Sequence, residues 1–219
     1  MSLTPTQVTD KTADYIGSLF SSETDFLRKL QVDAAAEGIP PISIGGIQGA
    51  FLQVLLKAIN ARYVLEIGSL AGYSALTMAQ VLPDDGKVVC MEFQPEFAAF
   101  IRKKADESGL GHNIEIIAGD AKESLRNYAP DFQFDFVFID ADKPGYGEYL
   151  GLTYPLVRQG GIIAGDNALA WGYIAEEHLD FEPENVRGIQ RFNRALAQHP
   201  GLLSCLIPTG DGMAMGVKL

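Results

Sequence analysis

The 219-residue sequence contains few residues suited to thiol or imidazole chemistry: it has two cysteines and three histidines. Cys90 and Cys205 lie far apart within apolar runs, and no C-x-x-C pair is present to indicate a zinc or redox site. We expect both to be buried thiols in a reducing compartment. His112, His178 and His199 are scattered along the chain, and we expect them at the surface.

Positive charge and long apolar runs are also scarce. Lys and Arg number 17 against 28 Asp and Glu, so the formal net charge is −11, which repels phosphate backbones and anionic membranes. The first twenty residues lack a basic start and a continuous apolar core, and no apolar run reaches the roughly 18 residues of a membrane span. We therefore expect a cytoplasmic protein that binds no membrane, and the charge disfavours nucleic acid as a partner.

Hydrophobic residues make up 47% of the chain, and their spacing changes near residue 60. Before that point they recur at helical intervals, first after the cap-like segment Ser22–Asp25 and again over residues 47–58. From Tyr63 onward, short apolar runs alternate with helical segments; the runs are YVLEIG, KVVCMEF, NIEIIAG, FDFVFID and GGIIAGD. This alternation is typical of an α/β fold with a parallel sheet covered on both faces.

The pattern changes again after Asn185. A helical segment precedes the apolar runs LLSCLIP and GMAMGVKL, which are joined through Thr209-Gly210-Asp211-Gly212. This turn predicts a hairpin, so the last strand should be antiparallel. We expect a single domain over residues 1–219, with N-terminal helices in residues 1–60 and an α/β core in residues 61–219.

A glycine-containing turn follows the first predicted strand. Gly68 and Gly72 allow the backbone to approach a ligand closely, although turns of this kind also have purely structural roles. Glu92 ends the next strand, where doubly wound folds place the acid that binds a ribose. The G-x-G-x-x-G spacing of dinucleotide-binding proteins is absent, so we expect an adenosine-type ligand without a pyrophosphate.

The third strand leads into Gly119-Asp120-Ala121. We expect this segment to form the wall beside the adenine. Asp120 fits two roles, a hydrogen bond to the exocyclic amine or a cap of the helix that follows.

Two carboxylates and an amide are predicted at the carboxyl ends of two further strands. One strand ends in Asp140, and the next ends in Asp166 and Asn167, at the sheet edge where open α/β folds bind ligands. Oxygen ligands of this kind suit Mg²⁺, Mn²⁺ or Ca²⁺. Strand-end acids also cap helices or pair with a lysine such as Lys143, so spacing alone leaves both interpretations open.

Four stretches together resemble the cation-dependent, S-adenosylmethionine-dependent O-methyltransferases, the family of the caffeoyl-CoA and catechol O-methyltransferases. They are VLEIGSLAGYSALTMAQVLPDDGKVVCMEFQPEFA, FDFVFIDADKPGYGEYL, GGIIAGDNALAWG and RFNRALAQHPGLLSCLIPTGDGMAMGVKL. The resemblance extends from about Gly45 to the C-terminus. It implies a Rossmann-like class I methyltransferase fold, with a seven-stranded, mostly parallel sheet, an antiparallel last strand, helices on both faces, and a homodimer.

The resemblance also implies roles for individual residues. The cofactor contacts would be Ile44, Glu66, Gly68, Ser69, Ser74, Glu92, Gly119, Asp120, Ala121, Asp140 and Asp142. Among these, Glu92 would hold the ribose and Ala121 would lie against the adenine. The metal ligands would be Asp140, Asp166 and Asn167, with Mg²⁺ the preferred cation, and Lys143 would be the general base.

The implied reaction transfers a methyl group to a hydroxyl of a small catechol-type or hydroxycinnamoyl phenol, either free or as a CoA ester. The cation would favour the phenolate of an acceptor whose pKa is ordinarily about 10, and Lys143 would take the proton. Trp171 and Tyr173 would form an aromatic wall for the acceptor, or Trp171 would pack at a subunit contact.

Three other functions match parts of the pattern. A tRNA-modifying O-methyltransferase would keep the chemistry, but the negative charge opposes it. A nicotinamide-dependent oxidoreductase would share the fold and the ribose acid, but it would leave the Asp166-Asn167 pair unexplained. A non-catalytic binding module would leave Lys143 and the metal set without a role.

Overall fold

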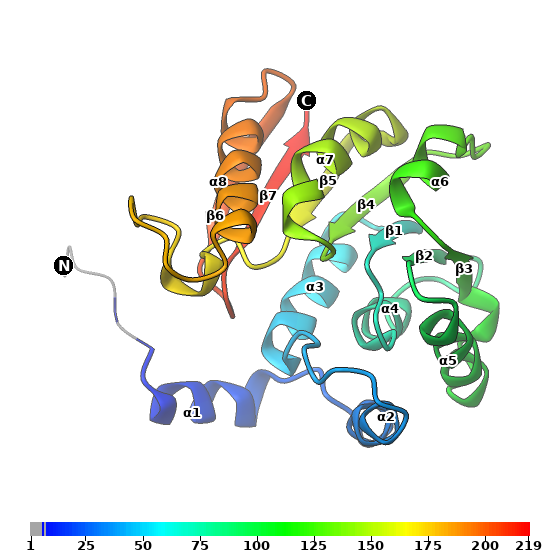
Figure 1. The fold of residues 1–219 in the computed structure, drawn as a ribbon. Helices are drawn as coiled ribbons and strands as arrows, with labels where there is room; N and C mark the ends of the chain where they lie inside the picture. The colour runs from blue at the N-terminus through cyan, green and yellow to red at the C-terminus, as the bar shows by residue number, and fades with distance from the viewer. Residues whose placement is uncertain (1–5, 7) are drawn as a thin grey trace.

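A seven-stranded sheet forms the middle layer of the structure, a computed structural model that describes residue 6 and residues 8–219 (Figure 1). The strands are β1 (Tyr63–Ile67), β2 (Lys87–Glu92), β3 (Ile114–Ala118), β4 (Phe134–Ile139), β5 (Val157–Gly165), β6 (Leu202–Ile207) and β7 (Met213–Lys218). Their order across the sheet is β3-β2-β1-β4-β5-β7-β6. Strands β1 to β5 pair in parallel, whereas β7 is antiparallel to β5 and to β6. The predicted mostly parallel sheet with an antiparallel last strand is confirmed.

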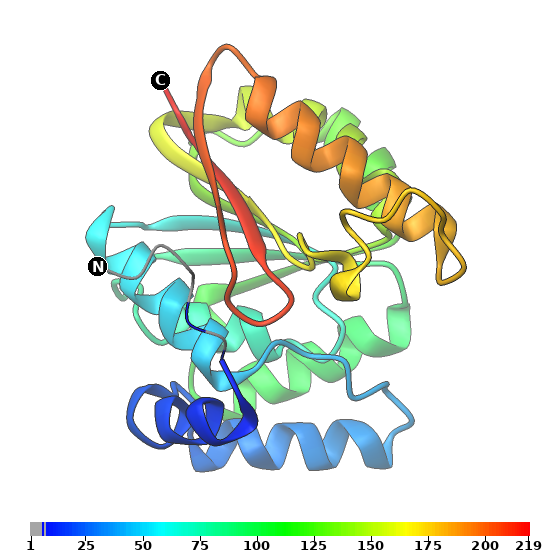
Figure 2. The same ribbon diagram turned by 90° about the vertical axis from the view of Figure 1, so that its left-hand side faces the viewer.

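Helices cover both faces of this sheet. The α-helices are α1 (Asp10–Phe20), α2 (Asp25–Ala36), α3 (Gly46–Ala58), α4 (Tyr73–Ala79), α5 (Pro95–Glu107), α6 (Ala121–Asn127), α7 (Tyr146–Thr153) and α8 (Pro183–Gln198). Short 3₁₀ helices are η1 (Gly111–Asn113), η2 (Lys143–Gly145), η3 (Tyr154–Leu156) and η4 (Ala170–Gly172). Figures 1 and 2 show α3, α4 and α5 on one face and α6, α7 and α8 on the other.

The strands are apolar along their whole length because both of their faces are covered. In β1, Val64 packs in the core that includes α3, α4 and α5, whereas Leu65 and Ile67 pack in the core that includes α7 and α8. Successive side chains of a strand point to opposite faces, so a strand between two helical layers needs apolar residues at both parities.

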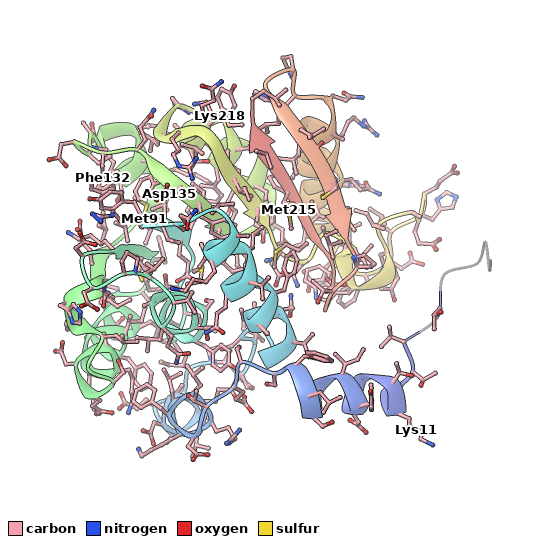
Figure 3. The ribbon with its side chains drawn as sticks, turned by 180° about the vertical axis from the view of Figure 1, so that it is seen from behind. Lys11, Met91, Phe132, Asp135, Met215 and Lys218 are labelled. Carbon is pink, nitrogen blue, oxygen red and sulfur yellow. The ribbon has the colours of Figure 1, made fainter. Side chains whose placement is uncertain are left out.

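Asp135 joins three strands at their amino ends (Figure 3). Its carboxylate, on β4, accepts hydrogen bonds from the backbone N–H of Arg62 (2.7 Å) and of Tyr63 (2.8 Å), at the start of β1. It also accepts a hydrogen bond from Nε of Arg158, on β5, at 2.5 Å. These contacts fix the relative positions of β1, β4 and β5, whose opposite ends form the candidate site.

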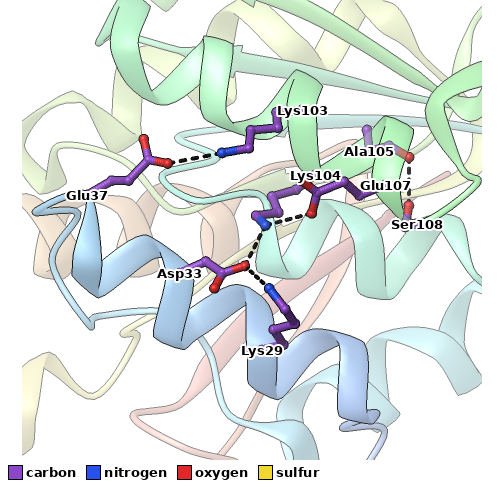
Figure 4. A network of polar contacts seen from close by, with 8 residues as sticks. All are labelled: Lys29, Asp33, Glu37, Lys103, Lys104, Ala105, Glu107 and Ser108. Carbon is purple, nitrogen blue, oxygen red and sulfur yellow. Dashed lines mark hydrogen bonds and ion pairs between the residues drawn. The ribbon is translucent and has the colours of Figure 1, made fainter.

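Ion pairs hold α2 on the core (Figure 4). The Lys104 side chain of α5 is only 3% exposed, and its Nζ lies 2.6 Å from Asp33 Oδ2 on α2 and 2.7 Å from Glu107 Oε2. A buried ammonium group is costly unless carboxylates surround it. The ion pairs therefore anchor α2, and residues 42–44, a little further along the chain, reach the candidate site.

Helix α1 lies within residues 1–60, where N-terminal helices were expected, but ahead of the helical spacings identified in the sequence. None of its residues is buried, and its outer side chains include Tyr15, Leu19 and Phe20. No helix in the described part of the chain combines the length and the apolar character needed to cross a membrane.

Two expectations about individual side chains are wrong. Cys90 is buried in β2, as expected, but Cys205 is exposed, because β6 is an edge strand with β7 as its neighbour in the sheet. His199 is half-buried rather than at the surface, and its ring lies 4.3 Å from that of Tyr154, centroid to centroid. His112 and His178 are exposed, as expected.

Candidate functional site

A cavity of about 860 Å³ opens at the carboxyl ends of the parallel strands. Most of the predicted site residues line it: Ile44, Gly68, Ser69, Ser74, Glu92, Gly119, Asp120, Ala121, Asp140, Asp142, Lys143, Asn167 and Trp171. Glu66 and Asp166 are not part of the lining; they are buried in or next to the strand ends, 0% and 5% exposed. Strand ends about 100 residues apart in the sequence, from Gly68 to Asn167, thus meet in one place because their strands are parallel neighbours.

The turn after β1 depends on glycine. Gly68 has φ +83°, and a Cβ atom there would lie 2.3 Å from the carbonyl oxygen of Asp140. Any side chain would therefore displace the backbone that presents Asp140. Gly72, with φ +79°, precedes α4, and the first residues of this helix, Tyr73 and Ser74, line the cavity.

Glu92 is held by two backbone donors. Its Oε2 accepts a hydrogen bond from Leu70 N–H at 2.8 Å, and its Oε1 accepts one from Gln94 N–H at 2.9 Å. Each carboxylate oxygen can accept more than one hydrogen bond, so capacity remains for two neighbouring hydroxyls. Asp120 accepts a hydrogen bond from Lys122 N–H at 2.7 Å and caps α6; of the two roles considered for it, the structure shows the cap.

Glu66 is a buried carboxyl group without a hydrogen-bond partner among the described residues. Both of its oxygens lack a partner, as does the hydroxyl of Ser69. Burial is the main cause that raises the pKa of Glu66 to about 7; the nearby hydroxyls of Ser69 and Ser74 oppose the rise, and the charges of Asp140 and Glu92 add to it. Unpaired buried acceptors are costly, and their place beside the cavity suits a ligand with a positively charged or N–H donor group.

Asp140 and Asp166 lie next to each other at the ends of β4 and β5. Ile139 of β4 pairs with Gly165 of β5, and Asp166 N–H donates to Ile139 O at 3.1 Å. Burial, together with the neighbouring Asp140 charge, raises the pKa of Asp166 to about 7. Asn167, with φ +56°, directs the chain back toward the cavity.

This donor set fits a divalent cation. Two adjacent carboxylates repel each other, and a cation between them would replace that repulsion with attraction. Asp140, Asp166 and Asn167 offer the oxygen ligands that Mg²⁺ and Mn²⁺ accept. Among residues 6 and 8–219 no group of three or more His, Cys, Asp or Glu side chains could hold a metal; in this set the Asn167 amide oxygen would add a third protein ligand to the two carboxylates.

Lys143 is held between two oxygens. Its Nζ lies 2.8 Å from Asp140 Oδ1 and donates to Tyr146 Oη at 2.7 Å. Tyr146 is fully buried, and its ring packs edge-on against Phe192 of α8. The lysine side chain is 11% exposed and lines the cavity, so it can reach a ligand bound there.

Sequence reasoning missed Gln48. This residue of α3 is 8% exposed, and its Nε2 donates to Asp166 Oδ1 at 2.8 Å. Its Oε1 accepts a hydrogen bond from Gly45 N–H at 3.4 Å. The signal in the sequence was a glutamine among apolar residues at helical spacing. An amide that is buried at such a position needs a hydrogen-bond partner.

Asp142 has protein partners of its own. Its Oδ1 accepts a hydrogen bond from Tyr149 Oη at 2.5 Å, and its Oδ2 lies 3.2 Å from Lys122 Nζ. Both partners line the same part of the cavity. The predicted cofactor contact therefore belongs to a small polar cluster rather than acting as an isolated acid.

The aromatic wall differs from the expectation. Trp171 lines the cavity and is 40% exposed, whereas Tyr173 is not among the lining residues. Phe181 joins the two: its ring centroid lies 5.7 Å from that of Trp171 and 5.1 Å from that of Tyr173. Tyr173 thus packs behind Trp171 through Phe181.

Known proteins match this chain in sequence and in structure. The O-methyltransferase family model matches residues 18–219. A catechol O-methyltransferase of Niastella koreensis is 35% identical over 218 residues, covering 96% of this chain and 98% of the relative. A caffeoyl-CoA O-methyltransferase of Petroselinum crispum is 34% identical over 206 residues, covering 90% and 86%.

Solved structures agree with this match. The O-methyltransferase from Bacillus cereus in complex with SAH has a TM-score of 0.88 at 30% identity, covering 94% of this chain and 96% of that one. The O-methyltransferase TomG from Streptomyces achromogenes in complex with SAM has a TM-score of 0.86 at 29% identity, covering 95% and 96%.

Proposed function

The chain belongs to the O-methyltransferase family and is an S-adenosylmethionine-dependent enzyme; from this premise we propose that it methylates a hydroxyl of a small phenol with the help of a divalent cation. The observation that supports the cation and the acceptor class is the pair of carboxylates at the ends of β4 and β5, beside Lys143. The acceptor we propose is a catechol or a hydroxycinnamoyl group with two neighbouring oxygens, free or as a CoA ester.

The cofactor would occupy the part of the cavity at β1, β2 and β3. Glu92, fixed by its two backbone donors, is suited to hold the ribose hydroxyls. The unpaired acceptors of Glu66 and Ser69 are suited to the methionine end. The remaining contacts we propose are Ile44, Gly68, Ser74, Gly119, Asp120, Ala121, Asp140 and Asp142, which line the same cavity.

Asp140, Asp166 and Asn167 would hold the cation, with Mg²⁺ our first choice; when bound, it supplies positive charge that favours the ionised acceptor hydroxyl. Lys143, as the neutral amine, would take the proton of that hydroxyl at Nζ, which Asp140 and Tyr146 hold at the cavity wall. Bound S-adenosylmethionine would supply the methyl group to the acceptor oxygen and would leave as S-adenosylhomocysteine. Holding the reacting atoms in line would account for much of the rate.

Trp171 would face the acceptor, since it lines the cavity beside Asn167 and Lys143. We also propose one domain over residues 1–219, a cytoplasmic location and a homodimer. The homodimer is supported by the exposed apolar side chains of α1.

A methyl-transfer screen tests this function. Catechols, hydroxycinnamates, their CoA esters and tRNA are offered with S-adenosylmethionine, with Mg²⁺ or with excess EDTA. We expect turnover of a small phenol that needs the cation, and Asp140→Ala should lose that turnover while calorimetry still detects S-adenosylhomocysteine. Full activity of Asp140→Ala or of the wild type in EDTA would contradict the role of the cation, and methylation of tRNA alone would contradict the acceptor.

A further inference from the structure

The turn of the C-terminal hairpin, Thr209–Gly212, lies against the loop that presents Trp171. Ala168 N–H donates to Gly212 O and Leu169 N–H to Asp211 O, both at 2.9 Å. Trp171 N–H donates to both oxygens of the Asp211 carboxylate, each at 2.9 Å. One turn, more than 35 residues further along the chain, therefore binds three backbone donors of this loop.

The loop needs such support because its backbone is strained. Ala170 has φ +50° and Trp171 has φ +55°, in the left-handed region that residues with a Cβ atom rarely adopt. Conformations of this kind persist only where surrounding contacts hold them, and they concentrate at functional sites. Hydrogen bonds to a charged acceptor are stronger than neutral ones, so the Asp211 carboxylate is well suited to hold the Trp171 backbone.

Close packing reinforces the same turn. A Cβ atom at Gly212 would lie 2.6 Å from Leu169 Cγ. A Cβ atom at Gly210 would lie 2.3 Å from Cδ of Gln48, the residue that hydrogen-bonds Asp166. The turn thus lies directly against both the Trp171 loop and the residue that supports the proposed metal ligand.

We propose that Asp211 is a positioning residue for acceptor specificity: by holding the left-handed backbone at Trp171, it keeps the indole ring on the cavity wall that a planar phenol would contact. The role in acceptor binding rests on the proposed function. The role in holding the loop rests on the hydrogen bonds and backbone angles alone. The hydrogen bonds that Asp211 accepts come from the Trp171 loop and not from the residues proposed to hold the cofactor.

The chain offers a direct probe, because Trp171 is its one tryptophan. We would compare Asp211→Ala and Asp211→Asn with the wild type by acrylamide quenching of tryptophan fluorescence. Asp85→Ala serves as the control, since this exposed acid pairs with Arg62 at the amino end of the sheet. Quenching should increase about twofold in Asp211→Ala as the ring leaves the wall, and less in Asp211→Asn, which keeps one acceptor oxygen.

The kinetic result should separate the two ligands. In Asp211→Ala the KM for the phenol should rise about tenfold, because the hydrogen bond between Trp171 N–H and the Asp211 carboxylate no longer holds the loop and a bond to a charged group has an effect of that size. The kcat should change less, and the affinity for S-adenosylhomocysteine should stay within about twofold.

Unchanged quenching in a folded Asp211→Ala, or in Asp211→Asn if the alanine variant does not fold, would overturn the proposal. Increased quenching with an unchanged KM would overturn the role in acceptor recognition. Because quenching needs no turnover, it tests the loop even if the wild type methylates none of the phenols, a result that would instead refute the proposed function.

Discussion

Gly188 of α8 should be essential for activity because it lies against the backbone of Lys143. A Cβ atom at this position would be 2.4 Å from Lys143 O, 2.6 Å from Lys143 C and 2.8 Å from Pro144 N. All three are backbone atoms of η2, so no flexible side chain can move aside. To restore an ordinary contact, α8 and η2 must separate by about 1 Å.

We expect Gly188→Ala to lower kcat about 10²-fold, because a misplacement of about 1 Å at a reacting group has an effect of that size. Overpacking costs about 1–3 kcal/mol, and the better helix propensity of alanine offsets about 1 kcal/mol of this. The melting temperature should therefore fall by no more than about 8 °C, so the variant stays folded at 25 °C.

The assay is methyl transfer at 25 °C with saturating cofactor and cation, together with calorimetry of S-adenosylhomocysteine. Gly151→Ala is the matched control: it is also a helical glycine, in α7, and a Cβ atom there meets nothing within 4 Å. The control should keep its kcat, and both variants should bind S-adenosylhomocysteine normally. If Gly188→Ala has the kcat of the wild type, the close contact does not position Lys143 and the reasoning is refuted.

Two further predictions concern Glu66 and Gln48. The pKa of Glu66 is raised to about 7 from 4.5, so the folded ligand-free chain keeps a proton that the unfolded chain releases, and its stability should fall as the pH rises from about 4.5 to 7. Glu66→Gln should flatten this part of the pH dependence of stability, measured by urea unfolding. The part of the slope due to Asp166, whose pKa is also raised to about 7, should remain. An identical slope in the wild type and in Glu66→Gln would refute the role of Glu66. Gln48→Leu should weaken Mn²⁺ binding about tenfold, as loss of a hydrogen bond to a metal ligand does, in a titration followed by electron paramagnetic resonance. Gln53→Leu, on the same helix but bonded to Thr77 O and Gln80, is the control, and equal Mn²⁺ affinities in the two variants would count against a role for Gln48.

Local patterns were sufficient to predict the sheet and the acids that lie at its carboxyl edge. Short apolar runs alternate with helical segments only where strands lie between two helical layers, and a residue that ends such a run must emerge at one edge of the sheet. Glu92, Asp140 and Asp166 were therefore predictable as neighbours of a ligand at that edge, and all three lie at or beside the cavity. Their individual roles remain proposals.

Contacts between distant segments were not predictable in this way. Gln48 and Asp166 are 118 residues apart, and nothing in the spacing of either segment indicates that α3 lies beside the end of β5. The closeness of Gly188 to Lys143 likewise depends on where α8 crosses η2. Exposure of Cys205 follows from the place of β6 at the sheet edge, which is a property of strand order.

The sequence by itself determined which apolar runs form strands and which acids stand at the strand ends, because hydrophobic period and turn chemistry act over a few residues. Only the tertiary structure decided what supports those acids: Gln48 beside Asp166, Tyr146 beside Lys143, and Asp211 under the Trp171 loop. Hydrogen bonds at 2.7 to 2.9 Å require atoms to be placed within a fraction of an ångström. That placement comes from the packing of the whole chain, which the sequence of a short segment does not specify.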